Sequence, residues 1–167
     1  MITDMNFMQR SLLFAKLASI AYSDDTKQVK KDARALGFTE IEFYNRDGAQ
    51  AYRFQNKTDI VIACRGTQPS EFNDIKADLK AAPVISETVG RVHRGFKDEV
   101  DELWKLVEED LCECGKKRKA WFTGHSLGAA MTTIMASRCE DDPRMHSSLQ
   151  RQSSQRRSCL ASTPRSP

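Results

Sequence analysis

The stretch Gly124-His125-Ser126-Leu127-Gly128 has the residue types and the spacing that turn a serine into a nucleophile. A Gly-x-Ser-x-Gly pattern puts the serine on a tight strand-to-helix turn, where its hydroxyl stands clear of the sheet. The glycines are needed because neighbouring backbone passes too close for side chains. The next amide, on Leu127, points at the same space, and the positive end of the following helix favours negative charge there. The motif therefore predicts that Ser126 is a nucleophile.

The segments on either side of the motif have the composition that such a turn requires. Residues 120–123, Ala-Trp-Phe-Thr, predict a short strand, and Leu127 to Arg138, rich in Ala and Met, predicts a helix. Residues 59–64 form a nearly continuous apolar run, typical of a strand that is covered on both faces. Strand, sharp turn and helix in this order make a βα unit. We therefore expect an α/β fold, with a mainly parallel sheet flanked by helices.

Three further helices are predicted from the spacing of apolar residues. One covers residues 4–22, and its expected buried face comprises Leu13, Leu17, Ile20 and Ala21. A second covers residues 27–36 and stops at Gly37, a residue that readily adopts the left-handed conformation after a helix. The third covers residues 96–112, and its expected buried stripe comprises Val100, Leu103, Trp104 and Leu111.

A hairpin is predicted between the second helix and the apolar run. Two short aromatic segments, residues 41–44 and 51–54, flank the turn Asn45-Arg46-Asp47-Gly48. Between Gly66 and Gly95 the pattern is mixed, and we expect mostly loop with one short helix.

Composition excludes several classes of function. The 167 residues suffice for one domain with a core, and a net charge of +3 gives no reason to expect a nucleic-acid partner. No apolar run approaches the roughly 20 residues of a membrane span. Between Ser11 and Tyr22 the apolar residues recur three and four apart, which favours a packed helix over an export signal.

The cysteines favour a reducing compartment. There are five, an odd number without a regular framework, so we expect reduced thiols and a cytoplasmic protein, with secretion by a non-classical route as the alternative. Cys112 and Cys114 have no second Cys/His pair nearby, so neither a metal nor a cofactor is expected.

The motif at Ser126 resembles the G-H-S-L-G of the class 3 lipases, the fungal-lipase-like branch of the α/β-hydrolases. Two more segments are similar to that family, in the right order. Ile62-Ala63-Cys64-Arg65-Gly66-Thr67 is similar to its strand ending in R-G-[ST], and Val92-His93-Arg94-Gly95-Phe96 to its V-H-x-G-F before a long helix. Residues 17–22, Leu-Ala-Ser-Ile-Ala-Tyr, resemble the family's opening helix. The resemblance covers about residues 10–139 and implies a partial α/β-hydrolase fold.

The resemblance implies a role for each matching residue of the site. Ser126 would be the acyl-accepting nucleophile. The amides of Leu127 and Thr67 would form the oxyanion hole, with the Thr67 hydroxyl as an extra donor. The implied substrate is a lipid or a small ester.

Residues 69–82 occupy the place of the family's lid. Phe72, Ile75 and Leu79 lie at helical spacing and form either the apolar underside of that lid or ordinary core packing. In the first case, the Phe72–Leu79 segment would make transient contact with a lipid interface.

Other polar side chains near these motifs are interpreted as structural. His125 adjoins the serine, but consecutive residues at such a turn point in different directions, so it should not reach the hydroxyl. His93 is interpreted as a packed, hydrogen-bonded histidine. Arg65 and Asp78 are expected to pair beneath the oxyanion loop.

A serine hydroxyl needs a general base, and the base needs an orienting carboxylate. In this fold they follow the serine in the order Asp, then His, each after a later strand. The residues after the motif offer only Glu140, Asp141, Asp142 and His146. The helix from Leu127 to Arg138 rises about 18 Å, which carries those acids to the far end of the sheet. We therefore expect the triad Asp and His to be absent from this chain.

The composition changes at about Glu140, where a Ser/Arg-rich segment begins. We expect the N-terminal part of a hydrolase domain over residues 1–139, and a disordered tail outside the family over residues 140–167. A truncation, a frameshift or an alternative splice product would each produce such a tail. The expected function is that of a carboxylic-ester (lipid) hydrolase of the triacylglycerol lipase or esterase type, incomplete in this chain. The alternative is a catalytically dead binding or regulatory module that keeps the hydrolase scaffold.

Overall fold

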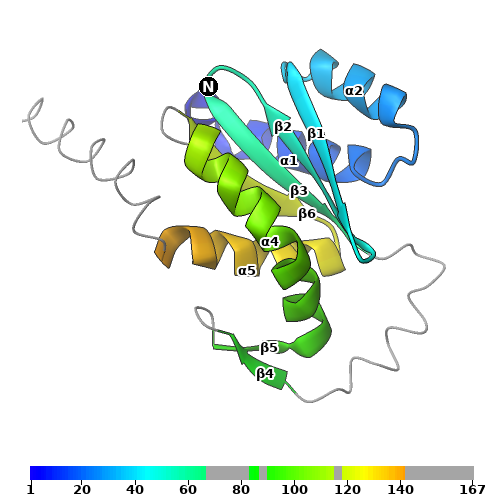
Figure 1. Ribbon diagram of the computed structural model, residues 1–167. Helices are drawn as coiled ribbons and strands as arrows, with labels where there is room; N and C mark the ends of the chain where they lie inside the picture. The colour runs from blue at the N-terminus through cyan, green and yellow to red at the C-terminus, as the bar shows by residue number, and fades with distance from the viewer. Residues whose placement is uncertain (67–82, 87–89, 115–117, 142–167) are drawn as a thin grey trace, which may run out of the picture.

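The computed structural model describes residues 1–66, 83–86, 90–114 and 118–141. A four-stranded sheet lies between two pairs of helices, α1 and α2 on one face and α4 and α5 on the other (Figure 1). In chain order the elements are η1 (Ile2–Asp4), α1 (Phe7–Ile20), α2 (Thr26–Ala35), β1 (Glu40–Arg46), β2 (Ala49–Gln55), β3 (Asp59–Arg65), β4 (Pro83–Ser86), β5 (Gly90–His93), α4 (Arg94–Cys114), β6 (Lys119–Gly124) and α5 (Leu127–Asp141). Within these ranges no helix is long and apolar enough to cross a membrane.

The sheet has the order β1-β2-β3-β6 and is mixed. Only β3 and β6 pair in parallel, whereas β1–β2 and β2–β3 are antiparallel. The expected α/β fold is confirmed, but the sheet is not mainly parallel over the described strands. The reason is the length of the connections. Short turns join β1, β2 and β3 and impose antiparallel pairing, while the chain between β3 and β6 is long enough to include α4 and cross over.

Strand β3 is the centre of the core. Its residues from Ile60 to Cys64 are all 0% exposed, as the apolar run predicts. Because side chains alternate along a strand, Ile60, Ile62 and Cys64 pack with α4 and α5, while Val61 and Ala63 pack with α1 and α2. Two separate apolar clusters therefore hold the three layers together.

The N-terminal helices begin where side chains cap them. Asn6 and Gln9 form a capping box, with the Asn6 side chain accepting from the Gln9 N–H at 2.9 Å, so α1 starts at Phe7 rather than at residue 4. Asp25 caps α2 by accepting from the N–H groups of Lys27 and Gln28. Gly37 follows α2 at a φ of +90°, as predicted. On the predicted face of α1, Leu13, Leu17 and Ala21 are buried and Ile20 is half-buried.

The predicted hairpin is confirmed, with longer strands and a tighter turn. β1 and β2 pair from Glu40↔Gln55 to Arg46↔Ala49, so only Asp47 and Gly48 lie between them. Both have positive φ, 46° and 89°, which is the backbone that suits a two-residue hairpin.

A second hairpin lies where the sequence pattern predicts mostly loop. β4 and β5 pair in an antiparallel manner, from Pro83↔His93 to Ser86↔Gly90. The prediction of loop over these residues is wrong, because strands of four residues are too short for their alternation to be recognised. The short helix expected in this region, if it lies within residues 67–82, falls outside the described residues.

On the other face, α4 packs with the stripe that its spacing predicts. Val100, Leu103 and Leu111 are buried, joined by Val107, while Trp104 is half-buried under the Arg138 guanidinium, 5.7 Å from its ring centroid.

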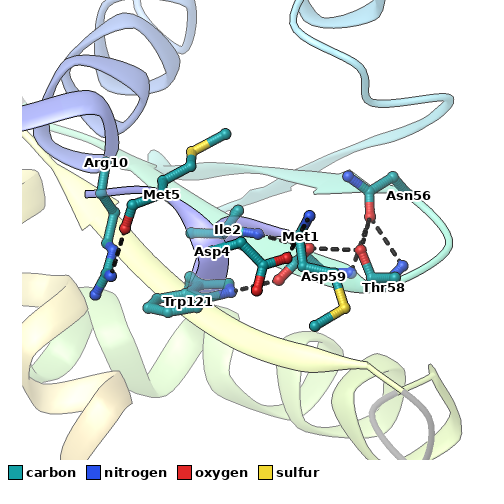
Figure 2. A network of polar contacts seen from close by, with 9 residues as sticks. All are labelled: Met1, Ile2, Asp4, Met5, Arg10, Asn56, Thr58, Asp59 and Trp121. Carbon is teal, nitrogen blue, oxygen red and sulfur yellow. Dashed lines mark hydrogen bonds and ion pairs between the residues drawn. The ribbon is translucent and has the colours of Figure 1, made fainter. Parts of the chain in front are cut away.

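The first residue of β3 carries a buried carboxylate. Asp59 is 1% exposed and accepts hydrogen bonds from the Ile2 N–H at 3.2 Å, the Trp121 indole N–H at 2.9 Å and the Thr58 hydroxyl at 2.6 Å. Figure 2 shows these groups converging from the N-terminal segment, β3 and β6. This network ties the start of the chain to the two central strands.

Candidate active site

Ser126 lies on a sharp turn between β6, which ends at Gly124, and α5, which begins at Leu127. Its φ of +55° is in the left-handed region, which costs a residue with a Cβ about 1–2 kcal/mol. The N–H groups of Ala129 and Ala130 donate to its carbonyl, at 2.9 and 3.4 Å. Ser126 is therefore the N-cap residue of α5. The structure therefore has the strained strand–turn–helix that the motif predicts.

The glycines of the motif are required by close backbone contact. A Cβ on Gly124 would lie 2.4 Å from the carbonyl carbon and oxygen of Gly128. A Cβ on Gly128 would lie 2.3 Å from the carbonyl oxygen of Cys64, at the end of β3. No side chain fits at either position, so α5 lies directly against the strands.

The end of β3 reaches the same turn. Cys64 pairs with Gly124 in the parallel ladder, and a Cβ on Gly66 would come within 2.9 Å of both the Gly128 nitrogen and the His125 oxygen. Thr67 comes next in the chain but lies outside the described residues. The end of β3, which precedes the predicted oxyanion residue in the sequence, therefore lies against the serine turn.

The Leu127 side chain is 8% exposed and belongs to the core cluster under α5, so this residue is firmly anchored. As the first residue of α5, it carries an N–H that the helix itself does not use. The same helix end has a partial positive charge. A negative oxygen held beside Ser126 would meet both.

His125 presents its carbonyl, not its ring, to the interior of the turn. That carbonyl accepts from the Gly128 N–H at 3.0 Å and from the Tyr22 hydroxyl at 3.1 Å. The imidazole is exposed and meets the Tyr22 ring edge-on, with centroids 6.1 Å apart. No motif in the sequence assigns a role to Tyr22, whose segment only resembles the opening helix of the family.

Arg65 forms an ion pair with a residue other than the expected one. Its guanidinium lies 2.7 Å from the Asp24 carboxylate, in the connection between α1 and α2. Asp78, the expected partner, lies outside the described residues, and so do the Phe72–Leu79 segment, Asp142 and His146. The side chain of His93 is also outside them.

Cys64 pairs with Gly124, the first residue of the serine motif, so its thiol must be considered as a second nucleophile. Burial raises the pKa of Cys64 far above its usual value, and the negative charge of Glu99 adds to this. Burial also raises the pKa of the Glu99 carboxyl. A buried thiol with a raised pKa is unreactive, so Cys64 does not compete with Ser126 as a candidate nucleophile.

The first described acid after the motif is at the far end of α5. Glu140 lies in the last turn of that helix, about 20 Å along its axis from Leu127. Within the described ranges no group of three or more His, Cys, Asp and Glu side chains is arranged to hold a metal ion. The Cys64 and Cys112 thiols form no disulfide.

A sheet covered by helices on both faces, with a serine at positive φ between a parallel strand and a helix, defines a partial α/β-hydrolase fold. The particular family follows from the sequence match. Residues 61–163, more than half of the chain, match the model of the lipase (class 3) family, and the chain belongs to that family. No curated protein matches the chain.

Solved structures show the same fold. The chain is similar to a fungal lipase in complex with an inhibitor, at 19% identity and a TM-score of 0.63, over 83% of this chain and 57% of that one. It is also similar to a triacylglycerol lipase whose catalytic centre is described as a serine protease triad, at 20% identity and a TM-score of 0.59, over 77% and 53%. The Rhizomucor miehei triacylglyceride lipase is similar at 21% identity and a TM-score of 0.58, over 84% of this chain and 59% of that one. The chain thus spans little more than half the length of these lipases.

Proposed function

We propose that this chain is the nucleophile-bearing part of a carboxylic-ester hydrolase that acts on lipids of the triacylglycerol class. The observation that carries the proposal is the strained turn at Ser126, packed through Gly128 against the end of β3. Family membership and the triacylglycerol lipases among the structural relatives support the substrate class.

In the proposed reaction, the Ser126 hydroxyl oxygen attacks the ester carbonyl, and the carbonyl oxygen becomes an oxyanion. The N–H groups of Leu127 and Thr67 donate to that oxyanion, and the N-terminus of α5 adds a favourable field. Donors of this kind each contribute about 3–4 kcal/mol to the transition state. The serine proton must pass to a general base, which then protonates the leaving alkoxide.

The proposal includes the absence of that base from the described part of the chain. Glu140 is about 20 Å away along α5, and the His125 ring faces Tyr22. Without a base, ester turnover by the chain alone is slow, although oxyanion stabilisation by itself supports about 10³-fold acceleration over water.

The test is covalent labelling with a long-chain alkyl fluorophosphonate, followed by mass spectrometry of the peptide that contains Ser126. We expect one adduct, on Ser126, which disappears in Ser126→Ala and persists in Ser19→Ala, a change at an exposed serine of α1. A short-chain phosphonate should label more slowly if the site accepts lipids. Adducts spread over several serines, or equal labelling of Ser126→Ala, would refute the assignment. Because no base activates the serine, the adduct should form slowly, and no adduct even after prolonged incubation at high probe concentration would favour the catalytically dead module.

A further inference from the structure

The hydroxyl of Tyr22 lies where the two halves of the candidate site meet. It donates to the His125 carbonyl at 3.1 Å, one peptide before the strained serine. The ring also contacts the His125 imidazole edge-on. Tyr22 follows α1 in the chain and is separated from His125 by 103 residues, so this contact joins distant parts of the sequence.

The same hydroxyl abuts the end of β3. A Cβ on Gly66 would lie 2.7 Å from the Tyr22 oxygen, closer than real contacts allow. Gly66 is therefore in direct contact with the tyrosine, and it immediately precedes Thr67. One oxygen atom thus touches both the serine turn and the strand end that leads to the second proposed oxyanion donor.

A second bond from the same connection holds that strand end. Two residues after the tyrosine, Asp24 pairs with Arg65 at 2.7 Å. The Arg65 side chain is 11% exposed, so its guanidinium has little freedom to move. Residues 22–24 therefore hold the serine turn at one point and the residue before Gly66 at another.

The His125 carbonyl uses both of its acceptor positions, one for the Gly128 N–H and one for Tyr22. These two bonds fix the plane of the peptide that enters the left-handed Ser126. If the tyrosine hydroxyl is removed, one bond remains and that peptide is freer to rotate. Its rotation would move Ser126 relative to the Leu127 N–H, although no substrate contact is lost.

We propose that Tyr22 is a positioning residue that sets the spacing between the Ser126 turn and Gly66, just after β3. It acts through the His125 carbonyl and Gly66, not on the substrate. This inference rests on the proposed function, because the spacing matters only if the two amides share an oxyanion.

The test compares Tyr22→Phe with Tyr44→Phe in the full chain. Each change removes one hydroxyl that donates a hydrogen bond and keeps its ring, but Tyr44 donates to Asp110 of α4, away from the turn. The measured quantity is the rate at which Ser126 is phosphonylated, per folded molecule. We expect Tyr22→Phe to lower it about tenfold, since small misplacements of reacting groups have effects of this size or larger. Tyr44→Phe should leave it unchanged.

Amide hydrogen exchange supplies a readout that needs no chemistry. In Tyr22→Phe, exchange should rise at residues 125–128 and at Gly66, but not at the Asp59 end of β3. A purely structural role would raise exchange throughout the chain or nowhere.

The outcomes separate the two proposals. If Ser126→Ala labels as well as the wild type, or the wild type does not label, the proposed function fails and the inference falls with it. If Ser126 labels normally in a folded Tyr22→Phe, or local exchange at the turn is unchanged, only the positioning role is wrong. If Tyr22→Phe does not fold, Asp24→Asn removes the other bond at an exposed carboxylate, 82% accessible. Unchanged labelling and exchange at residues 65–66 in that variant would overturn the inference.

Discussion

At its first residue β3 carries a buried carboxylate, and at its last residues it runs against the serine turn. Both ends contact β6 and the N-terminal part of the chain, but they use their polar groups differently. At the Asp59 end, the carboxylate accepts three hydrogen bonds from protein donors, including the Trp121 indole and the Ile2 N–H (Figure 2). These groups are satisfied inside the protein, so this end contributes stability.

At the other end the backbone is strained and closely packed. Ser126 is held at a φ of +55°, and Gly128 touches the Cys64 carbonyl. Strain of this kind persists only where the surrounding structure enforces it. The comparison indicates that the start of β3 stabilises the fold, whereas the end of β3 lies against a strained turn that destabilises it. We propose the chemistry at that strained end.

The largest effect should come from filling the contact between α5 and β3. Gly128→Ala puts a Cβ 2.3 Å from the Cys64 carbonyl oxygen, so helix and strand must separate. We expect the free energy of unfolding to fall by about 3–5 kcal/mol, with loss of Ser126 labelling. Urea denaturation and phosphonate labelling measure the two losses.

The matched control is Gly48→Ala in the hairpin turn. Gly48 has a positive φ of 89°, but no atom lies within 4 Å of its would-be Cβ. It should lose only about 1 kcal/mol, from backbone strain alone. Equal losses in the two variants would show that close packing at the serine turn is not the cause.

The next effect tests the Asp59 end. Asp59→Ala leaves the Trp121 indole N–H and the Ile2 N–H without their acceptor in a buried site. An unsatisfied buried donor costs about 1–3 kcal/mol, so we expect a loss of about 2–3 kcal/mol in urea denaturation. Asp59→Asn should lose less, since one oxygen still accepts. Labelling of Ser126 per folded molecule should not change, and a selective loss of labelling would break the proposed division between the two ends.

A smaller effect should reveal the strain at the serine itself. Ser126→Gly and Ser126→Ala both remove the hydroxyl, but only glycine adopts positive φ without a Cβ penalty. We expect the glycine variant to be more stable than the alanine variant by about 1 kcal/mol, after allowing for the greater freedom of glycine in the unfolded chain. If alanine is equally stable at this position, the turn is not strained.

Local signals predicted the elements of the fold better than their assembly. The serine motif, the apolar β3 and the glycine after α2 each depend on residues near one another in sequence, and each was predicted. The mixed pairing was not, because the apolar character of β3 reports burial on both faces but not the direction of its neighbours.

The sequence motifs identify a candidate site, but they do not identify its long-range contacts. Tyr22 and Asp24 reach His125 and Arg65 over long sequence separations, so no spacing rule identifies them. Asp59 was likewise included in an apolar run, although its three donors come partly from Ile2 and Trp121, 57 and 62 residues away. Such long-range pairs can be identified only from the three-dimensional packing of the helices on the sheet.

The smallest predicted effect concerns a third polar cluster, under α4. The Tyr44 hydroxyl donates to Asp110, which also pairs with Arg53 at 2.8 Å. Like Asp59, Asp110 bonds to other groups of the protein. One of them, the Tyr44 hydroxyl, can lose its proton at high pH. Burial, and then the hydrogen bond to Asp110, raise the pKa of Tyr44 well above its usual value.

The sign of the pH effect follows from that shift. A raised pKa in the folded state means that the contribution to stability is complete below the unfolded pKa of about 10 and is lost as the pH rises above it. Between pH 8 and pH 10.5, Tyr44 alone should lower the free energy of unfolding by about 0.8 kcal/mol. Tyr44→Phe removes this contribution, so its stability should fall less over the same range. Tyr52 and Cys64, whose pKa values burial also raises, keep part of the slope in both proteins. Urea denaturation at the two pH values, with reductant present, measures the difference. Equal falls in wild type and variant would mean that Tyr44 ionises as readily in the folded chain as in the unfolded one, which its burial beside Asp110 opposes.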